Sequence, residues 1–408
     1  GNTYTLLSGS SLSASGISLT GTGISGLTVA LGDTVAGLAG TQSVFLKNDG
    51  GAVLTFSAPG TIRPALVLNA TNTVINVGGF GASGISNYLQ STFDIVKGTA
   101  TAVNNTASNL TINSERSIRV LDRDILGSLD GTSAPVNKQI NVALNSNSLD
   151  QFSGGIALEG QRGVNVQTFG GNITLGGAST PTGRAWGVSG EQNTDGILLQ
   201  NTVLDSSVST GPTITGGGNI TLRGKSATTA TSYTSSDGTT SNANGIRVHG
   251  SVTMDAAAGK LNLWGVGQSA TGSSNGIELS MLTTSTSVYK SASSATDAIT
   301  FNGTATNAAA SDAWGVYLWG YSSLLASNGG GISITGSGAK HSGVVLPSGS
   351  AVLSTGGPIT LTGTGYGAGY NAVDVAGYVG LKAGSSITNS SSTLPIPRRK
   401  SVLIPAPN

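Results

Sequence analysis

Apolar and small polar residues alternate in short segments along most of the chain, and glycines flank nearly every segment. Because side chains at every second position share one face of a strand, this alternation predicts short strands with one buried face. The clearest segments are 173–175, 220–222, 261–263, 299–301, 332–334 and 359–361, and weaker copies lie earlier at 110–112 and 140–142. The flanking glycines indicate tight turns or bends. Asn172 lies directly before one of these strands, and we expect it to stack with turn residues of neighbouring repeats.

A second strand type alternates with the first and begins with a small residue, usually glycine, followed by Ile or Val. Its copies are 155–158, 196–199, 245–248, 276–279, 315–318, 343–346 and 372–375. A third short apolar group often follows it, as at 203–204, 252–254, 324–325 and 352–353. Each repeat therefore contains three short strands in a fixed order.

The spacing of the repeats indicates how the strands are arranged. Equivalent strands lie 27 residues apart from Ile332 to Ile359 and 29 apart from Val344 to Val373. Three short strands and three turns need about that many residues, so one repeat forms one turn of a three-sided coil. We predict an all-β, three-sided parallel β-helix of about ten to twelve stacked coils with capped ends. An antiparallel sandwich is the alternative, but it does not require near-identical strands at regular intervals.

Both ends of the chain depart from this pattern. We expect an N-terminal cap and the first coils in residues 1–80, and the β-helix body in residues 81–390. Residues 391–408 are rich in proline, which cannot donate to a strand ladder, so we expect an extended tail there. This tail packs either on its own solenoid or on a neighbouring subunit. Its candidate subunit-contact residues are Leu394, Ile396, Val402, Leu403 and Ile404.

The composition excludes several classes of function. Only 9% of the 408 residues are charged and the formal net charge is +1, so the chain lacks the basic face of a nucleic-acid-binding protein. Cysteine is absent, which excludes disulfides, thiol nucleophiles and cysteine-ligated zinc. No run of about 18 apolar residues occurs, so no transmembrane helix is predicted. We expect no cofactor and no metal ion.

The alternation of "GGxIxLxG" and "GIxL" segments over residues 105–390 resembles bacterial secreted right-handed parallel β-helix proteins. These are the filamentous-haemagglutinin-like adhesins and the autotransporter passenger domains. The resemblance implies a right-handed solenoid and a location outside the cell or at the bacterial cell surface. We therefore expect a non-enzymatic structural protein, either an adhesin or scaffold or a self-assembling filament subunit. Its partners would be copies of itself, joined through solenoid ends and the tail into a homo-oligomer or homopolymer.

Two long insertions carry an alternative hypothesis. Residues 176–196 and 225–245 interrupt the repeat, and the second is almost entirely Ser, Thr, Ala, Asn and Gly. Insertions of this kind leave one corner of a coil without disturbing the stack, and binding residues often lie on them. The alternative is a monomeric adhesin that binds a glycan or a host surface through these loops.

A third hypothesis is a polysaccharide lyase or hydrolase with the β-helix fold. Residues 115–130 contain the densest charge, with Glu115, Arg116, Arg119, Asp122, Arg123, Asp124 and Asp130. Paired carboxylates beside arginines can act as acid and base on a glycoside. We favour an alternating-sign surface network instead, because such enzymes recruit carboxylates from several adjacent coils.

Residues 313–323 contain four aromatic side chains, and period two between Val316 and Leu318 predicts that Tyr317 points outward. We consider Tyr317, Trp319 and Tyr321 a candidate surface for sugar stacking or subunit contact. The competing interpretation is that these rings fill coil corners. The two histidines, His249 and His341, are expected at solvent-facing strand or turn positions.

Overall fold

The computed structural model describes the chain in nineteen segments. They are residues 16–20, 41–47, 54–56, 65–68, 72–78, 88–91, 94–97, 108–114, 116–122, 124–126, 139–147, 153–177, 183–189, 194–210, 213–235, 238–279, 286–319, 321–366 and 370–391.

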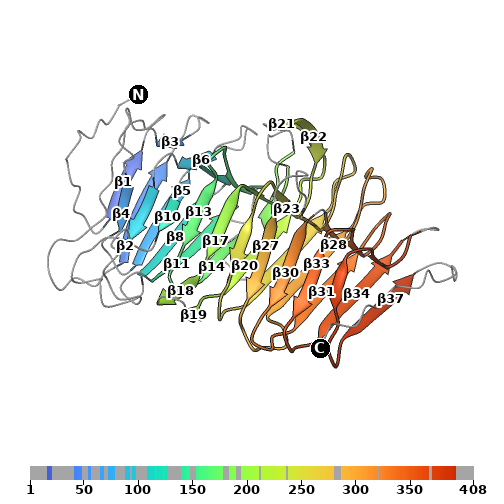
Figure 1. Ribbon diagram of the computed structural model, residues 1–408. Helices are drawn as coiled ribbons and strands as arrows, with labels where there is room; N and C mark the ends of the chain where they lie inside the picture. The colour runs from blue at the N-terminus through green and yellow to red at the C-terminus, as the bar shows by residue number, and fades with distance from the viewer. Residues whose placement is uncertain are drawn as a thin grey trace.

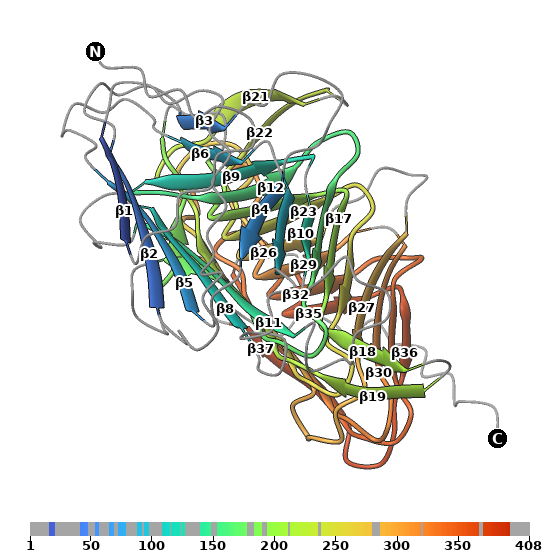
Figure 2. The same cartoon turned by 90° about the vertical axis from the view of Figure 1, so that its left-hand side faces the viewer.

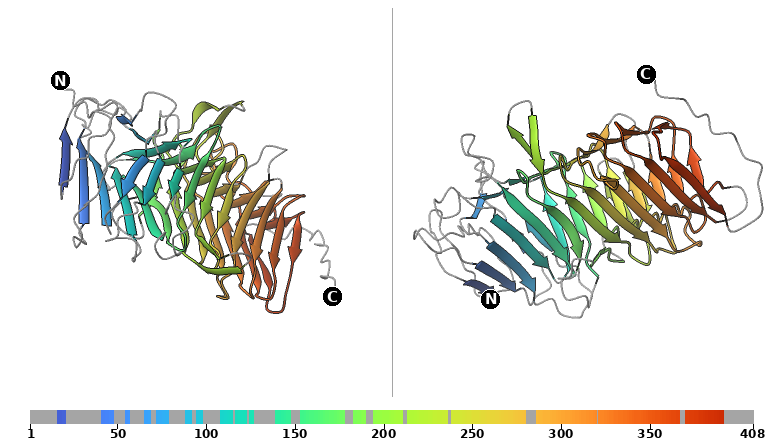
Figure 3. Two further views of the ribbon diagram at one scale, coloured as in Figure 1. Left: turned by 60° about the vertical axis from the view of Figure 1, so that its left-hand side comes forward. Right: turned by 90° about the horizontal axis from the view of Figure 1, so that it is seen from below.

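The described strands form a three-sided parallel β-helix, as the repeat predicts. Three walls run along one axis, from the N-terminal strands to the C-terminal strands (Figures 1 and 3). We name these walls sheets A, B and C. Sheet A has thirteen strands, and sheets B and C have ten each. Figure 2 views the stack from its N-terminal side.

The first strand type of the sequence builds sheet A, the third builds sheet B and the second builds sheet C. Sheet A stacks β1 (Gly16–Thr20), β2 (Thr41–Lys47), β5 (Asn72–Gly78), β8 (Ser108–Ser114), β11 (Ile140–Ser146), β14 (Ile173–Gly177), β20 (Ile220–Lys225), β25 (Leu261–Gly267), β28 (Ile299–Ala305), β31 (Ile332–Ser337), β34 (Ile359–Gly365) and β37 (Ser386–Ser391), with β15 (Ala185–Trp186) beside β20. Sheet B stacks β4 (Ala65–Leu68), β7 (Asp94–Lys97), β10 (Asp124–Leu126), β13 (Val164–Gln167), β17 (Thr202–Asp205), β24 (Thr253–Asp255), β27 (Ser287–Ser291), β30 (Ser322–Ala326), β33 (Ala351–Ser354) and β36 (Tyr378–Gly380). Sheet C stacks β3 (Leu54–Phe56), β6 (Tyr88–Ser91), β9 (Ser117–Leu121), β12 (Ile156–Glu159), β16 (Ile197–Gln200), β23 (Ile246–His249), β26 (Ile277–Leu279), β29 (Val316–Leu318), β32 (Val344–Leu346) and β35 (Val373–Val375).

Each coil contributes one strand to sheet C, then one to sheet B and one to sheet A. In sheets B and C nine coil-to-coil steps separate the first strand from the last, and the described walls form a solenoid of about nine coils, close to the ten to twelve we expected. The right-handed sense implied by the resemblance stays a prediction.

The core consists of apolar rungs that stack from coil to coil. Ile173, Ile220 and Leu261 follow one another in register on sheet A, and all three side chains are fully buried. Burying one such side chain contributes about 1.5–3 kcal/mol. The alternation of buried and part-buried positions along β11 and β25 follows the period of two read from the sequence.

The glycine that ends the "ITLxG" segment has a role other than the expected turn. Gly265 lies inside β25, where a Cβ atom would come within 1.9 Å of the carbonyl oxygen of Gly276. Gly336 stands in the same relation to Gly343. Sheets A and C thus approach each other backbone to backbone along this corner, and only glycine fits there.

The insertions leave the coil at its corners. Residues 225–245 carry the antiparallel hairpin of β21 (Thr231–Ser235) and β22 (Gly238–Asn242), which projects from the stack (Figure 1). Within 176–196, β15 lies parallel to the end of β20 and so extends sheet A, while residues 178–182 and 190–193 lie outside the described part. A second hairpin, β18 (Ser207–Thr210) with β19 (Thr213–Gly217), connects sheets B and A.

The two ends of the chain are described to different extents. Strands β1 to β5 place parts of residues 1–80 within the three walls. Tail residues 392–408, including Leu394, Ile396, Val402, Leu403 and Ile404, lie outside the described residues. Among the described residues, no helix is long and apolar enough to cross a membrane.

Candidate functional site

Exposed aromatic side chains gather in the last three coils of the described structure. They are Trp319, Tyr321, Tyr366, Tyr370 and Tyr378. Trp319 follows β29 on sheet C, whereas Tyr370 precedes β35, two coils further along the same sheet. The aromatic run of residues 313–323 is therefore followed by exposed aromatic side chains in each of the next two coils.

Five rings form a connected set, which we name the aromatic ladder. Trp314 stacks on Tyr317 in its own coil, with ring centroids 4.5 Å apart, and on His341 of the next coil at 4.8 Å. Trp319 meets Tyr317 edge to face at 5.3 Å. Tyr370 meets His341 edge to face at 4.4 Å. The ladder thus joins three successive coils through side chains alone.

The inner and terminal rings of the ladder differ in exposure. Tyr317 alternates with the buried Val316 and Leu318, which is the outward orientation we expected, but it is only 9% exposed because Trp314 covers it. Trp319 and Tyr370 are 47% and 42% exposed. Of the three predicted contact residues, Trp319 and Tyr321 are therefore accessible, and Tyr317 supports Trp319 from beneath.

The expectation that both histidines face solvent is wrong. His249 and His341 are 8% and 7% exposed. His341 lies between the rings of Trp314 and Tyr370, and its Nε2 is 3.5 Å from Asp312 Oδ1. The period of a strand does not show that rings from neighbouring coils cover a turn residue.

Charged groups surround the aromatic ladder. Burial, followed by the nearby carboxylates of Glu278 and Asp312, raises the pKa of the Tyr317 hydroxyl. Asp374 is exposed on the outer face of sheet C, in register with Val345 and, through it, with Tyr317. The Nζ of Lys340 donates to the carbonyl oxygens of residues 310 and 311, each at 3.1 Å. Carboxylates therefore outnumber the lysine around these rings.

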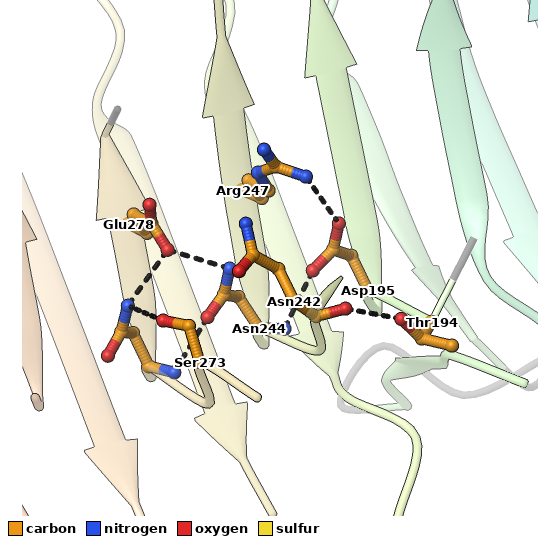
Figure 4. A network of polar contacts seen from close by, with 8 residues as sticks. Thr194, Asp195, Asn242, Asn244, Arg247, Ser273 and Glu278 are labelled. Atoms are coloured by element: carbon orange, nitrogen blue, oxygen red, sulfur yellow. Dashed lines mark hydrogen bonds and ion pairs between the residues drawn. The ribbon is translucent and has the colours of Figure 1, made fainter. Parts of the chain in front are cut away.

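A second cluster, which we did not predict from the sequence, combines charged and amide side chains from adjacent coils (Figure 4). Oδ2 of Asp195 lies 3.9 Å from Nη1 of Arg247, and both side chains are buried. The backbone N–H of Asn244 donates to Asp195 Oδ1, and that of Asn275 donates to Asn244 Oδ1, both at 2.7 Å. Glu278 Oε2 accepts hydrogen bonds from the side-chain amides of Asn244 and Asn275, both at 2.8 Å.

The acidity of Asp195 is shifted strongly within this cluster. Burial raises the pKa of Asp195 to about 7, and this effect exceeds the opposing effects of Arg247 and of the N–H of Asn244. A carboxyl group that holds a proton near neutral pH, beside a second carboxylate, has the chemistry of a general acid. Asp195 is only 3% exposed, however, and its oxygens face Arg247 and the backbone of the next coil. Its contacts join coils rather than meet solvent.

The sequence contains a signal for this cluster that we did not use. Asp195, Asn244 and Asn275 each lie two residues before the Ile that begins a strand of sheet C. A polar residue at a constant position before equivalent strands predicts a ladder along the corner between sheets A and C.

The charged segment 115–130 makes contacts of the same coil-joining kind. Arg119 of β9 pairs with Glu159 at the end of β12 in the next coil. Asp122 Oδ1 accepts the backbone N–H groups of Arg162 and Gly163, at 2.7 and 3.1 Å. Glu115, Arg123 and Asp130 lie outside the described residues. Arg119 and Asp122 therefore both contact the neighbouring coil, and Asp122 holds one of its turns.

The arrangement of three parallel walls defines the class of this protein as a parallel β-solenoid. No family model, no curated protein and no solved structure matches the chain. Among the described residues, no group of three or more His, Asp or Glu side chains is suited to hold a metal ion.

Proposed function

We propose that this chain is a non-enzymatic structural protein located outside the cell, acting as an adhesin or scaffold of the bacterial secreted β-helix type. One observation carries the proposal. The charged clusters that reach across coils are used to join those coils, whereas the large apolar side chains exposed in the last three coils are mostly aromatic. A rigid rod with an adhesive surface needs this distribution more than a catalyst does.

The contacts of the carboxylates support the non-enzymatic part. Glu159, Asp195 and Glu278 each contact an arginine or an amide from a neighbouring coil. A glycosidase needs two carboxyl groups facing one substrate bond. These three carboxylates face the backbone and side chains of the solenoid itself.

The test combines an activity assay with microscopy. Purified protein is incubated with a panel of neutral and acidic polysaccharides, and reducing ends and unsaturated products are measured. We expect no product from any polymer and rigid rods in negative-stain images. Product formation that is lost in Asp122→Asn, Asp124→Asn or Asp195→Asn would show that the chain is an enzyme.

Self-assembly through the solenoid end is a second candidate, favoured by the last rung of sheet A. Ile387 of β37 continues the register of Leu361, but it is 36% exposed whereas Leu361 is fully buried. Within the described residues β37 also has a strand on one side only. An uncovered rung and an unpaired strand edge can accept a second chain.

The tail would take part in this contact. If this second candidate holds, negative-stain images should show fibres of the intact chain instead of single rods, and shorter or no fibres after truncation to residues 1–390. Normal assembly of the truncated chain would rule out the tail as the connecting element.

A further inference from the structure

The two terminal rings of the aromatic ladder have free faces. Trp314 is stacked on both Tyr317 and His341, with interplanar angles of 14° and 26°, so these inner rings use their faces on one another. Trp319 and Tyr370 meet the ladder at 64° and 79°. An edge-to-face contact fixes a ring while leaving much of its surface to solvent, which agrees with their exposure.

The ladder also holds these two rings in place. Trp319 packs on Tyr317, which lies in β29, and its backbone N–H donates to the carbonyl oxygen of Leu279 in the preceding coil at 2.9 Å. Tyr370 packs on His341, which is itself held by Trp314. Aromatic side chains that are ordered before binding lose little conformational entropy on binding. The two exposed rings are therefore a preorganised pair.

The outer face of sheet C lies between the two rings. Tyr317, Val345 and Asp374 follow one another in register there, one from each of three coils. Successive coils are about 4.8 Å apart, a spacing comparable to the length of one hexose unit in an extended chain. A polysaccharide that crosses this face would meet an aromatic ring near each end and a polar group, Asp374, along its path.

The charge of the surface selects among polysaccharides. Glu278, Asp312 and Asp374 contribute three negative charges, and Lys340 contributes one positive charge, because its hydrogen bonds to two carbonyl oxygens do not neutralise its ammonium group. An acidic polymer would be repelled by these carboxylates. An uncharged sugar ring, by contrast, presents an apolar C–H face to an aromatic ring and hydroxyl groups to carboxylate oxygens.

We propose that the outer face of sheet C in the last three coils, with Trp319 and Tyr370 at its ends, is a binding site for an uncharged polysaccharide. The inference rests on the proposed adhesin function and names the class of ligand that the adhesin takes. It places the contact on the coil surface rather than on the insertions 176–196 and 225–245.

Affinity electrophoresis with three neutral polymers and one acidic polymer tests the proposal. The full chain is run in native gels that contain hydroxyethylcellulose, galactomannan, dextran or heparin. We expect at least one neutral polymer to retard the protein, and heparin to leave its migration unchanged. Retardation by heparin alone, or by none of the four polymers, would overturn the proposal.

Variants locate the site. Trp319→Ala and Tyr370→Ala should each weaken binding about tenfold, and the double variant should remove the retardation. Trp264→Ala is the matched control, because Trp264 lies on the outer face of sheet A with Arg223 over its ring at 4.7 Å. Equal retardation of the wild type and the double variant would place the polymer elsewhere. Thermal melts monitored by circular dichroism confirm that each variant is folded.

The same samples separate this inference from the proposed function. If reducing ends appear in the gel polymer, the chain is an enzyme and the non-enzymatic function fails, while binding at the aromatic surface stands. If no polymer binds but rods are intact, the polysaccharide site fails alone. Sedimentation of the wild type and the double variant tests whether a second copy of the chain, instead of a polysaccharide, binds this surface. A dimer lost on substitution would assign the surface to a second copy and overturn the proposal.

Discussion

The side-chain Oδ1 of Asn172 accepts a hydrogen bond from the backbone N–H of Asn219 in the next coil, at 2.8 Å. The same contact repeats on both sides, from the N–H of Asn172 to Asn141 and from the N–H of Lys260 to Asn219, each at 2.8 Å. Asn172 therefore stacks with its neighbours as the sequence predicted. A second ladder along the corner between sheets A and C is buried, and it includes Asn275.

The two rows of hydrogen-bonded asparagines, one exposed and one buried, predict that the same Asn→Ala substitution lowers the stability by different amounts. Asn275→Ala removes the side-chain oxygen that accepts the backbone N–H of Trp314 and the side-chain amide that donates to Glu278. Because Asn275 is buried, this loss should cost about 1–3 kcal/mol of folding free energy. Asn172→Ala should cost about 0.5 kcal/mol, because water replaces the acceptor at an exposed turn. Urea denaturation of both variants measures the difference. Equal losses would mean that burial does not set the strength of these ladders.

The close approach of sheets A and C predicts which glycines tolerate a methyl group. A Cβ atom on Gly276 would lie 2.2 Å from the backbone nitrogen of Thr304, so Gly276→Ala should cost at least about 3 kcal/mol. Gly356→Ala is the control, since its nearest contact would be 3.3 Å and the turn is exposed. It should change stability by less than about 1 kcal/mol. A mild effect at Gly276 would show that the walls can move apart.

The position of an apolar core residue along the solenoid predicts how much stability is lost when its side chain is shortened to alanine. Leu263→Ala opens a cavity in a fully buried rung of β25 and should cost about 2–5 kcal/mol. Ile387→Ala should cost less than about 1.5 kcal/mol, because that side chain is partly exposed in the described structure.

Measuring the stability loss of Ile387→Ala at several protein concentrations shows which segment covers Ile387. If Ile387→Ala costs as much as Leu263→Ala at every concentration, the chain's own tail covers the last rung. If its cost grows with protein concentration, a second copy covers it, which would support assembly through this end.

The sequence predicted the fold well because the fold depends on local alternation. Ile173 and Leu175 belong to the core by their spacing alone, and identical strands must stack to bury that face. The polar clusters depend instead on how coils align across insertions of different lengths. Asp195 meets Arg247 only because the 225–245 insertion returns to the same corner. A charge-dense segment such as 115–130 is visible directly in the sequence, whereas a cluster assembled from three coils shows there only as a polar residue at a constant position before equivalent strands.

The same limit explains the aromatic surface. Tyr317 and Trp319 are neighbours in the sequence, so their association could be predicted from residues 313–323. His341 and Tyr370 come from turns of the next two coils, far from residues 313–323 in the sequence. Alternation shows whether a strand residue points inward, but it does not show what covers the outer face.

The acidity of Asp195 predicts a pH dependence of stability with a definite sign. The pKa of Asp195 rises from 3.8 to about 7 on folding, so between these values the folded chain holds a proton that the unfolded chain releases. The stability contributed by this group is complete below about pH 4 and is lost as the pH rises to about 7. The loss should be on the order of a few kcal/mol.

Asp195→Asn removes the titration and keeps an oxygen that can accept the N–H of Asn244. The decline in stability from pH 4 to pH 7, measured by urea denaturation, should therefore be flatter in the variant than in the wild type. Asp297→Asn is the control, because the hydrogen bond from Lys260 lowers the pKa of Asp297. Its contribution is present above its usual pKa and is lost only at lower pH, so this variant should keep the wild-type slope. Identical slopes for the wild type and Asp195→Asn would show that Asp195 stays ionised in the folded solenoid, held by Arg247.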